Sequence, residues 1–226
     1  MRSNTRSAAA SARENARLRH FYDRSAARYD DWMRHYDPVM LGDGRQQLCA
    51  QASGRTLELA IGTGLNIPHY PREVELTGID LTTAMLAHAA RRAHELGCAV
   101  TLRPDDAHAL DIPDATFDTV VATLLLSTIP NDHQAAAEAW RVLKPGGRLL
   151  LLDHVRSPIA PIRWLQWLAN PLIVRLTGVR LLRDPLDYLG AAGFSIEHCE
   201  RSHLGVIELV VARKGHCTED CTIPER

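Results

Sequence analysis

Glycines and carboxylates gather where the first predicted strands of this sequence end. The run Glu58-Leu59-Ala60-Ile61-Gly62-Thr63-Gly64-Leu65-Asn66 closes one apolar segment, Asp80 closes the next, and Asp106 follows a third. Glycine lets the backbone turn sharply and approach a ligand closely. A carboxylate at a strand end can accept hydrogen bonds from a ribose diol, and a second carboxylate can meet an adenine amino group. Together these residues predict a nucleoside site.

The same residues do not suit a dinucleotide. A dinucleotide fingerprint requires a third small residue where this chain has Ile67, and residues 68–71 leave room only for a short helix to hold a pyrophosphate. Glu58, four residues before the first glycine, would repel phosphate but would suit a cationic amino group. The pattern therefore predicts a nucleoside that carries an amino-acid tail.

Alternating strand and helix patterns position these side chains. We expect strands at residues 56–61, 75–80, 99–103, 117–123, 148–153, 194–200 and 206–212, the last two forming an antiparallel hairpin. We expect helices at residues 82–96, ending at Gly97, and at 132–143, followed by a turn at 144–147. Ligands of such sheets bind beyond the carboxyl ends of the strands.

This order of elements predicts an α/β fold. The sheet is expected to be Rossmann-like and doubly wound, with seven mostly parallel strands and an antiparallel last strand. Residues 1–12 are expected to be disordered, residues 13–213 to form one domain, and residues 214–226 to be a flexible tail. Within the domain, residues 13–52 should form a lid of two helices, and residues 158–192 an insertion over the acceptor site.

Taken together, the motifs resemble those of class I S-adenosylmethionine-dependent methyltransferases. The run from Glu58 to Gly64 is similar to the family's first motif, Asp80 to its second-strand acid, and residues 106–113 to its third motif. Residues 117–123 and the Arg141-Val142-Leu143-Lys144-Pro145-Gly146-Gly147 turn resemble the fourth- and fifth-strand segments, so that the resemblance covers about residues 20–213. Ala60 departs from the pattern, because many members have glycine there, and we expect alanine to be tolerated.

The resemblance implies S-adenosylmethionine as cofactor and gives each motif residue a role. Glu58, Gly62 and Gly64 would hold the methionine end, and Asp80 the ribose hydroxyls. Leu81 and Ala107 would flank the adenine ring, Asp106 would meet its amine, and Thr123 would lie near the sulfonium. Ala60, Asn66 and Met85 complete the predicted cofactor set. We expect no metal ion in the site.

The N-terminal segment Phe21-Tyr22-Asp23-Arg24-Ser25-Ala26-Ala27-Arg28-Tyr29-Asp30 resembles a segment of quinone-pathway and phospholipid methyltransferases. On a helix, Tyr22, Ala26 and Tyr29 would share one face. In those relatives the segment covers the cofactor, and we therefore predict that both tyrosines contact it. The alternative is that they only pack the helix against the domain.

Candidates for handling the methyl acceptor lie at the ends of the fourth and fifth strands. Methyl transfer from a sulfonium is an in-line displacement, so a base is needed only when the nucleophile arrives protonated. Asp153 and His154 are the predicted catalytic pair, because a histidine can take a proton near neutral pH. A structural histidine is the alternative. Ser127 and Thr128 are predicted to line the acceptor pocket.

The segment of residues 159–176 carries two tryptophans. Trp164, Trp167 and two leucines share helical spacing between Arg163 and Arg175, and Pro171 is expected to break or kink the run. Three interpretations remain open: an interfacial membrane helix, an apolar lid over a hydrophobic acceptor to which Trp164 and Trp167 contribute, or a helix packed on the sheet.

A narrower resemblance involves Asp153 to Ser157 and the tryptophan-rich insertion after it. These residues resemble those of a group that includes mammalian alkyl-thiol methyltransferases and bacterial phosphatidylethanolamine N-methyltransferases. The N-terminal membrane anchor of the mammalian enzymes is not seen in this sequence. The acceptors of that group are candidates for this chain.

Composition limits the other classes. The 226 residues carry a net charge of −1, so no global positive field draws the chain to nucleic acid. Five scattered cysteines do not form a disulfide pattern, and Cys217 and Cys221 lie in a polar tail that lacks a zinc-binding spacing. No run of apolar residues is long enough for a transmembrane helix. We expect a cytoplasmic protein, with peripheral membrane contact as an alternative; the oligomeric state stays open.

The sequence thus predicts methyl transfer from S-adenosylmethionine to a small or lipophilic acceptor, with a thiol or an amine, such as a small thiol or a phospholipid headgroup, ahead of other acceptors. O- or C-methylation of a quinol or phenol is the alternative. Two functions of other classes remain as alternatives: a non-catalytic sensor that binds S-adenosylmethionine, and an NAD-dependent oxidoreductase. Ile67 and Glu58 disfavour the oxidoreductase, because they do not suit a dinucleotide site.

Overall fold

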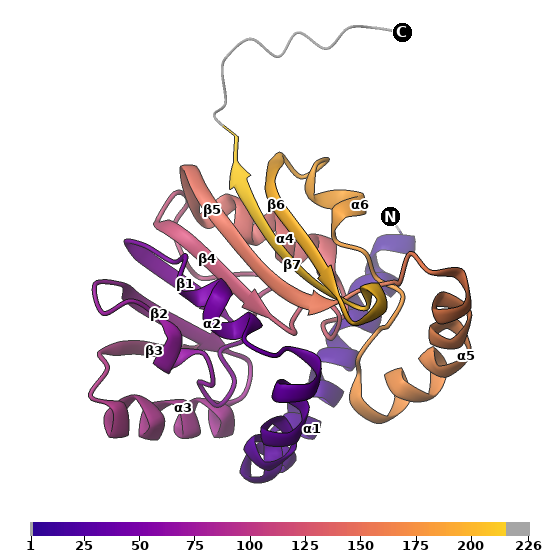
Figure 1. The fold of residues 1–226 in the computed structure, drawn as a ribbon, viewed down its shortest axis with the longest axis horizontal. Coiled ribbons are helices and arrows are strands. Elements are labelled where there is room, and N and C mark those ends of the chain that lie inside the picture. Colours follow the sequence, from indigo (N-terminus) through magenta and orange to yellow (C-terminus); the bar gives the residue numbers. More distant parts are fainter. Residues whose placement is uncertain (1, 216–226) are drawn as a thin grey trace, which may run out of the picture.

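A twisted sheet of seven strands forms the centre of the molecule (Figure 1). The computed structural model describes residues 2–215, with side chains from residue 13 onward. The strand order is β3-β2-β1-β4-β5-β7-β6, and only β7 runs antiparallel to the others. This confirms the doubly wound α/β fold and the antiparallel last strand.

The strands lie close to the ranges that the sequence predicts. They are β1 (Arg55–Leu59), β2 (Glu75–Asp80), β3 (Val100–Pro104), β4 (Phe117–Thr123), β5 (Leu143–His154), β6 (Phe194–Ser202) and β7 (Ile207–Lys214). The expected turn at residues 144–147 instead lies within the extended start of β5. The β4–β5 register shifts there, from Phe117 opposite Leu143 to Thr119 opposite Arg148, so the four residues bulge out of the ladder.

The helices are α1 (Arg2–Met40), α2 (Gly44–Cys49), α3 (Thr83–Leu96), α4 (Asp132–Val142), α5 (Ala160–Thr177) and α6 (Leu186–Leu189), with short 3₁₀ turns η1 (Ile67–His69) and η2 (His203–Gly205). The backbone of residues 2–12, expected to be disordered, belongs to α1, and the segment that we expect to form a lid consists of this long helix followed by the short α2. The Cys217 and Cys221 tail lies outside the described residues.

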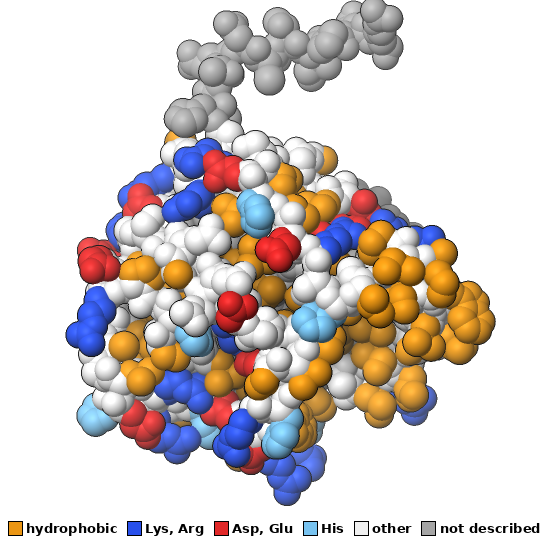
Figure 2. Space-filling view, in the orientation of Figure 1, with side chains coloured by type: hydrophobic (Ala, Val, Ile, Leu, Met, Phe, Trp, Pro, Cys, Tyr) orange, Lys and Arg blue, Asp and Glu red, His pale blue; other side chains and the backbone are white. Residues whose placement is uncertain are grey.

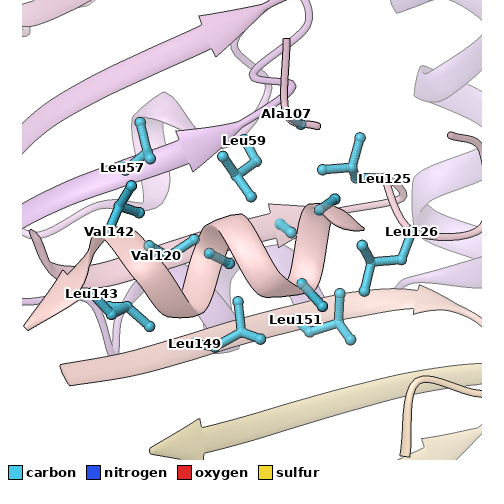
Figure 3. Close-up of a cluster of buried hydrophobic side chains, with 14 of the residues drawn as sticks. Leu57, Leu59, Ala107, Val120, Leu125, Leu126, Val142, Leu143, Leu149 and Leu151 are labelled. Atoms are coloured by element: carbon cyan, nitrogen blue, oxygen red, sulfur yellow. The ribbon is translucent and has the colours of Figure 1, made fainter. Parts of the chain in front are cut away.

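Alternating side chains of the strands build a core on each face of the sheet. Leu149 and Leu151 pack on α4 and α6, as Figure 3 shows for the α4 side, while Leu150 and Leu152 pack on α2 and the end of α1. Helix α3 covers the β2 end of that second face through Leu86 and neighbouring alanines. Because the faces of the sheet are covered, the open carboxyl ends of its strands remain as the place for a ligand.

Helix α5 does not pack on the sheet. It stands at the edge of the molecule, beyond β6 and β7 in Figure 1, and Gln166 is its one buried residue. Pro171 does not break the helix, one of the two outcomes that the sequence predicts: α5 continues to Thr177, and the proline lies on the exposed side, where water can satisfy the carbonyl that loses its partner. Among the described helices, none is both long and apolar enough to cross a membrane.

Candidate active site

A pocket of about 780 Å³, open at its mouth, lies between α1 and the carboxyl ends of β1 to β4. Ten of the thirteen predicted cofactor residues line it: Tyr22, Tyr29, Ala60, Gly62, Asp80, Leu81, Met85, Asp106, Ala107 and Thr123. Thr128, predicted as an acceptor residue, also lines it. The pocket has the mixed apolar and polar wall of a small-molecule site.

Asp80 ties the glycine turn to the end of β2. Its Oδ2 accepts from the Gly62 backbone N–H at 3.0 Å, and its Oδ1 accepts from the backbone N–H and the hydroxyl of Thr82, each at 2.9 Å. Burial raises the pKa of Asp80, while these hydrogen bonds oppose the rise. A carboxylate has about four acceptor positions, so Asp80 keeps about one for a ligand hydroxyl rather than the two that a ribose diol would use.

Ala60 and Gly64 show why this loop favours glycine. Ala60 lines the pocket with φ at 53°, in the left-handed region that strains an L side chain. Gly64 does not line the pocket: a Cβ there would lie 2.6 Å from Ile67 Cδ1 and 3.2 Å from the Ala89 backbone on α3. Gly64 therefore lets the loop pack on α3.

Glu58 and Asn66 also lie outside the pocket wall, in a buried array behind it. Asn66 Nδ2 donates to Glu58 Oε1 at 2.8 Å and to Thr123 Oγ1 at 2.9 Å, and the Tyr70 hydroxyl donates to Glu58 Oε2 at 2.9 Å. Arg45 donates to Asn66 Oδ1 at 2.9 Å. Burial raises the pKa of Glu58 to about 7, since the bonds from Tyr70 and Asn66 offset only part of the desolvation.

At the other end of the pocket, Asp106 is held by two partners that sequence reasoning missed. Its Oδ1 accepts from the backbone N–H and from Nδ1 of His108, at 2.9 and 2.6 Å, and its Oδ2 accepts from Asn15 Nδ2 of α1 at 3.0 Å. The bond from His108 is the main reason that the pKa of Asp106 is lowered. Because the Asn131 N–H donates to His108 Nε2, this network assigns the imidazole proton to Nδ1.

Helix α1 covers the pocket with two tyrosines. The Tyr22 and Tyr29 rings meet edge to face with centroids 6.3 Å apart, and both border the cavity. Burial raises the pKa of Tyr22 and raises that of Tyr29 to about 12, so both phenols are neutral at neutral pH. The predicted tyrosine face of α1 thus forms part of the pocket wall.

A charged clasp fixes α1 to the glycine turn. Asp30 accepts from the Thr63 hydroxyl and from Arg92 Nη2 of α3, both at 2.6 Å. Arg92 Nη1 donates to the Thr63 carbonyl, also at 2.6 Å. No sequence motif pointed to Arg92, and only the fold brings these three residues together.

Asp153 and His154 do not line the pocket. Asp153 is fully buried and accepts from the backbone N–H groups of Ser127 and His154, at 3.1 and 2.7 Å. His154 Nε2 pairs with the Tyr36 hydroxyl of α1, and its Nδ1 is buried 3.9 Å from Asp153 Oδ1. Burial lowers the pKa of His154, so the imidazole is neutral.

The insertion divides into two parts. Trp164 and Trp167 lie on the outer side of α5, each 62% exposed, and neither lines the pocket. The segment after α5 instead contacts the loop that carries Thr128 of the pocket wall: the Arg180 N–H donates to the Ser127 carbonyl at 2.7 Å, and its guanidinium donates to the Thr128 carbonyl at 2.8 Å. Ser127 itself is buried beside the pocket.

Comparisons with known proteins agree with this geometry. A family model described as a methyltransferase domain matches residues 57–151. The chain is 41% identical over 111 residues to a phosphatidylethanolamine N-methyltransferase of Cereibacter sphaeroides, which covers 48% of this chain and 55% of the relative. It is 30% identical over 192 residues to a demethylmenaquinone methyltransferase of Beutenbergia cavernae, covering 74% of this chain and 78% of the relative.

A solved structure is also similar in fold. An S-adenosylmethionine-dependent methyltransferase from Mesorhizobium loti superposes with a TM-score of 0.59 and 22% identity, covering 76% of this chain and 96% of that one. For several of the curated relatives, the chain spans only about half of their length.

Proposed function

Because the chain belongs to the S-adenosylmethionine-dependent methyltransferases, we propose that it transfers a methyl group to the amine of a phospholipid headgroup. The observation that carries the proposal is the pocket under α1, where two strand-end acids and two neutral tyrosines face one cavity. The family leaves the oxidoreductase alternative without support.

The residues of the pocket fit S-adenosylmethionine. Asp80 keeps an acceptor position for a ribose hydroxyl, and Asp106 is held as a carboxylate at the end where the adenine amine would lie. Leu81, Met85 and Ala107 offer an apolar wall for the adenine ring. Bound S-adenosylmethionine would supply a methyl group on a positively charged sulfur, already activated for displacement.

The protein then has to align the acceptor and exclude water. Helix α1 covers the cavity, and the clasp of Asp30, Thr63 and Arg92 holds it there. In-line displacement gains most from such alignment and desolvation. We propose no proton transfer to His154, whose Nε2 pairs with Tyr36 behind the pocket.

An amine acceptor is supported by the tyrosines and by the relatives. Aromatic rings attract the ammonium form of the headgroup, which must release its proton to water before the neutral nitrogen attacks the methyl carbon and the bond from that carbon to the sulfur breaks. The rings also favour the quaternary ammonium that successive transfers would produce. The Cereibacter sphaeroides relative carries a phosphatidylethanolamine N-methyltransferase name. A quinol is the second candidate, because the relative named for demethylmenaquinone matches over the larger part of both chains.

The proposal is tested by offering the purified protein labelled S-adenosylmethionine with three acceptors in separate reactions. The acceptors are phosphatidylethanolamine vesicles, reduced demethylmenaquinone in detergent, and a small alkyl thiol. We expect label in methylated phosphatidylethanolamine, and we expect Asp80→Asn to lower the rate at limiting cofactor. Label in the quinol or thioether alone would overturn the amine assignment. Cofactor binding without transfer to any acceptor would favour the sensor.

A further inference from the structure

Helix α5 is mounted with its polar side toward the protein. Gln166 is buried, and its amide donates to the Val155 carbonyl at 2.9 Å and accepts from the Ser157 N–H at 2.8 Å. Asn170 Oδ1 accepts from the Leu181 N–H at 2.9 Å. Surface helices of water-soluble proteins usually turn their apolar stripe toward the core. In α5 this arrangement is reversed.

The opposite side of α5 is a largely apolar face that also carries Arg175 near its C-terminal end, and it forms the orange region at the right of Figure 2. It consists of Trp164, Leu165, Trp167, Leu168, Leu172 and Leu176, each between 57% and 62% exposed. At 100° per residue, these six positions occupy about half of the helix circumference. Leu204 is a further exposed leucine near the start of α5. The Ser157 hydroxyl holds it there by donating to its backbone carbonyl at 2.6 Å. An exposed apolar surface of this kind indicates an interaction site.

The charged residues of the segment that contains α5 are all positive. Residues 157–183 contain four arginines and no aspartate or glutamate. Arg180 and Arg183 pair with Glu14 and Asp132, whereas within the described residues no ion pair involves Arg163 or Arg175 of α5. Tryptophan and leucine with arginines beside them suit an anionic lipid surface. A two-fold pairing of two copies through α5 would bring only positive side chains together, which disfavours a dimer.

The apolar face is joined to the pocket through α1. Arg17 donates to the carbonyls of Val174 and Arg175 at the end of α5, both at 3.1 Å. Gly178 follows α5 directly and packs closely on Leu18. A Cβ added to this glycine would lie 2.4 Å from Leu18 Cδ2. Leu18 also lines the pocket, so the end of α5 and the pocket wall meet at this residue.

We propose that α5 lies in the interface of an anionic lipid bilayer and brings the pocket to lipid acceptors. The use of this surface for a lipid acceptor rests on the proposed function, whereas the docking itself follows from α5 alone.

Flotation with vesicles tests the docking. Vesicles of equal parts phosphatidylglycerol and phosphatidylcholine should bind the protein, and pure phosphatidylcholine vesicles should bind it more weakly. Trp164→Ser with Trp167→Ser should weaken binding to anionic vesicles at least about tenfold. Arg163→Gln with Arg175→Gln should weaken it by about tenfold or more on anionic vesicles and little on neutral ones.

Matched variants elsewhere on the surface serve as controls. Trp32→Ser removes an exposed tryptophan of α1, and Arg72→Gln with Arg91→Gln removes two exposed charges; these should leave binding unchanged. Cofactor affinity, measured by calorimetry, should be equal in all variants, which shows that each is folded and separates this test from that of the methyl acceptor. Equal vesicle binding by wild type and the Trp164/Trp167 variant overturns the proposal, as does a wild-type dimer that this variant converts to a monomer.

Discussion

At the scale of single residues, Asp80 does two tasks at once. It holds the glycine turn through the Gly62 N–H and the next helix through Thr82, and it faces the pocket. A carboxylate that is already bonded to three donors is fixed in direction before a ligand arrives. Such prepositioning lowers the entropy lost on binding.

Asp80→Asn should weaken S-adenosylmethionine binding by about 1–3 kcal/mol, since an amide removes the charge and turns one acceptor into a donor. Isothermal calorimetry measures the change. Asp111→Asn, which alters a carboxylate that is 98% exposed, should leave the affinity unchanged. An Asp80→Asn protein with wild-type affinity would refute the ribose assignment.

Ala60 carries backbone strain that glycine would relieve. Ala60→Gly should raise the unfolding free energy by about 0.5–1 kcal/mol, because the left-handed penalty exceeds the extra entropy of glycine in the unfolded chain. Urea unfolding measures it. Ala87→Gly, at an exposed position inside α3, should lower stability by about 1 kcal/mol. A loss of stability at both positions would show that Ala60 is not strained.

The ring of Tyr29 should matter more than its hydroxyl if the acceptor is an amine. Tyr29→Phe keeps the aromatic face and should preserve most of the turnover with phosphatidylethanolamine, whereas Tyr29→Leu should raise the KM for the amine by about fivefold or more. Rates with lipid vesicles at saturating cofactor provide the measurement. Equal KM values for the two variants would leave the cation–aromatic argument without support.

At the scale of elements, the clasp ties α1 to the glycine turn and to α3. Asp30 and Arg92 are 32% and 23% exposed, so solvent screens their attraction only in part. Thr63 lies between them and is almost fully buried. The helix and the glycine turn should therefore move together.

Asp30→Asn should loosen α1 and weaken cofactor binding by about 1 kcal/mol, with faster hydrogen exchange across residues 20–36. Arg92→Gln should act similarly, and the double variant should lose less than the sum of the two. Arg91→Gln, whose guanidinium contacts only His88 among the described partners, should have no effect. Additive losses would mean that Asp30 and Arg92 act independently.

Most strands and the pocket residues could be predicted from the sequence, because apolar runs that end in glycine or aspartate are local signals. Local signals do not reach arrangements that a long-range partner decides. The sequence predicts a strand that ends at Asp153, next to His154, but the pairing of His154 with Tyr36 depends on where α1 passes. Likewise, the spacing of Trp164 and Trp167 predicts an apolar stripe on α5. It does not predict which side of the helix faces the rest of the domain.

At the scale of the whole molecule, the fold buries several acids near the carboxyl ends of the strands. Burial raises the pKa of Glu58, Asp80 and Asp153 alike. Each such group takes up a proton on folding at a pH where the unfolded chain has released it. Stability should therefore decline as the pH rises through their titration range.

The variant Glu58→Gln isolates the contribution of one residue to the pH dependence of folding stability. In the unfolded chain Glu58 ionises from its ordinary pKa of 4.5, whereas in the folded protein it stays protonated up to about 7. The wild-type unfolding free energy should thus fall between pH 4.5 and 7 and level off above, by at most about 3 kcal/mol from this residue. Glutamine stays neutral in both states, and its amide can still bond Asn66 and Tyr70.

The measurement is urea unfolding of wild type and Glu58→Gln at pH 4.5, 6, 7 and 8. The stability of the variant relative to wild type should rise with pH, while the slopes from Asp80 and Asp153 cancel in the difference. Glu138→Gln is a control of opposite sign, because Arg141 lowers the pKa of Glu138, and its relative stability should fall as the pH rises through the acid range. Parallel pH curves for wild type and Glu58→Gln would mean that Glu58 is ionised in its buried site.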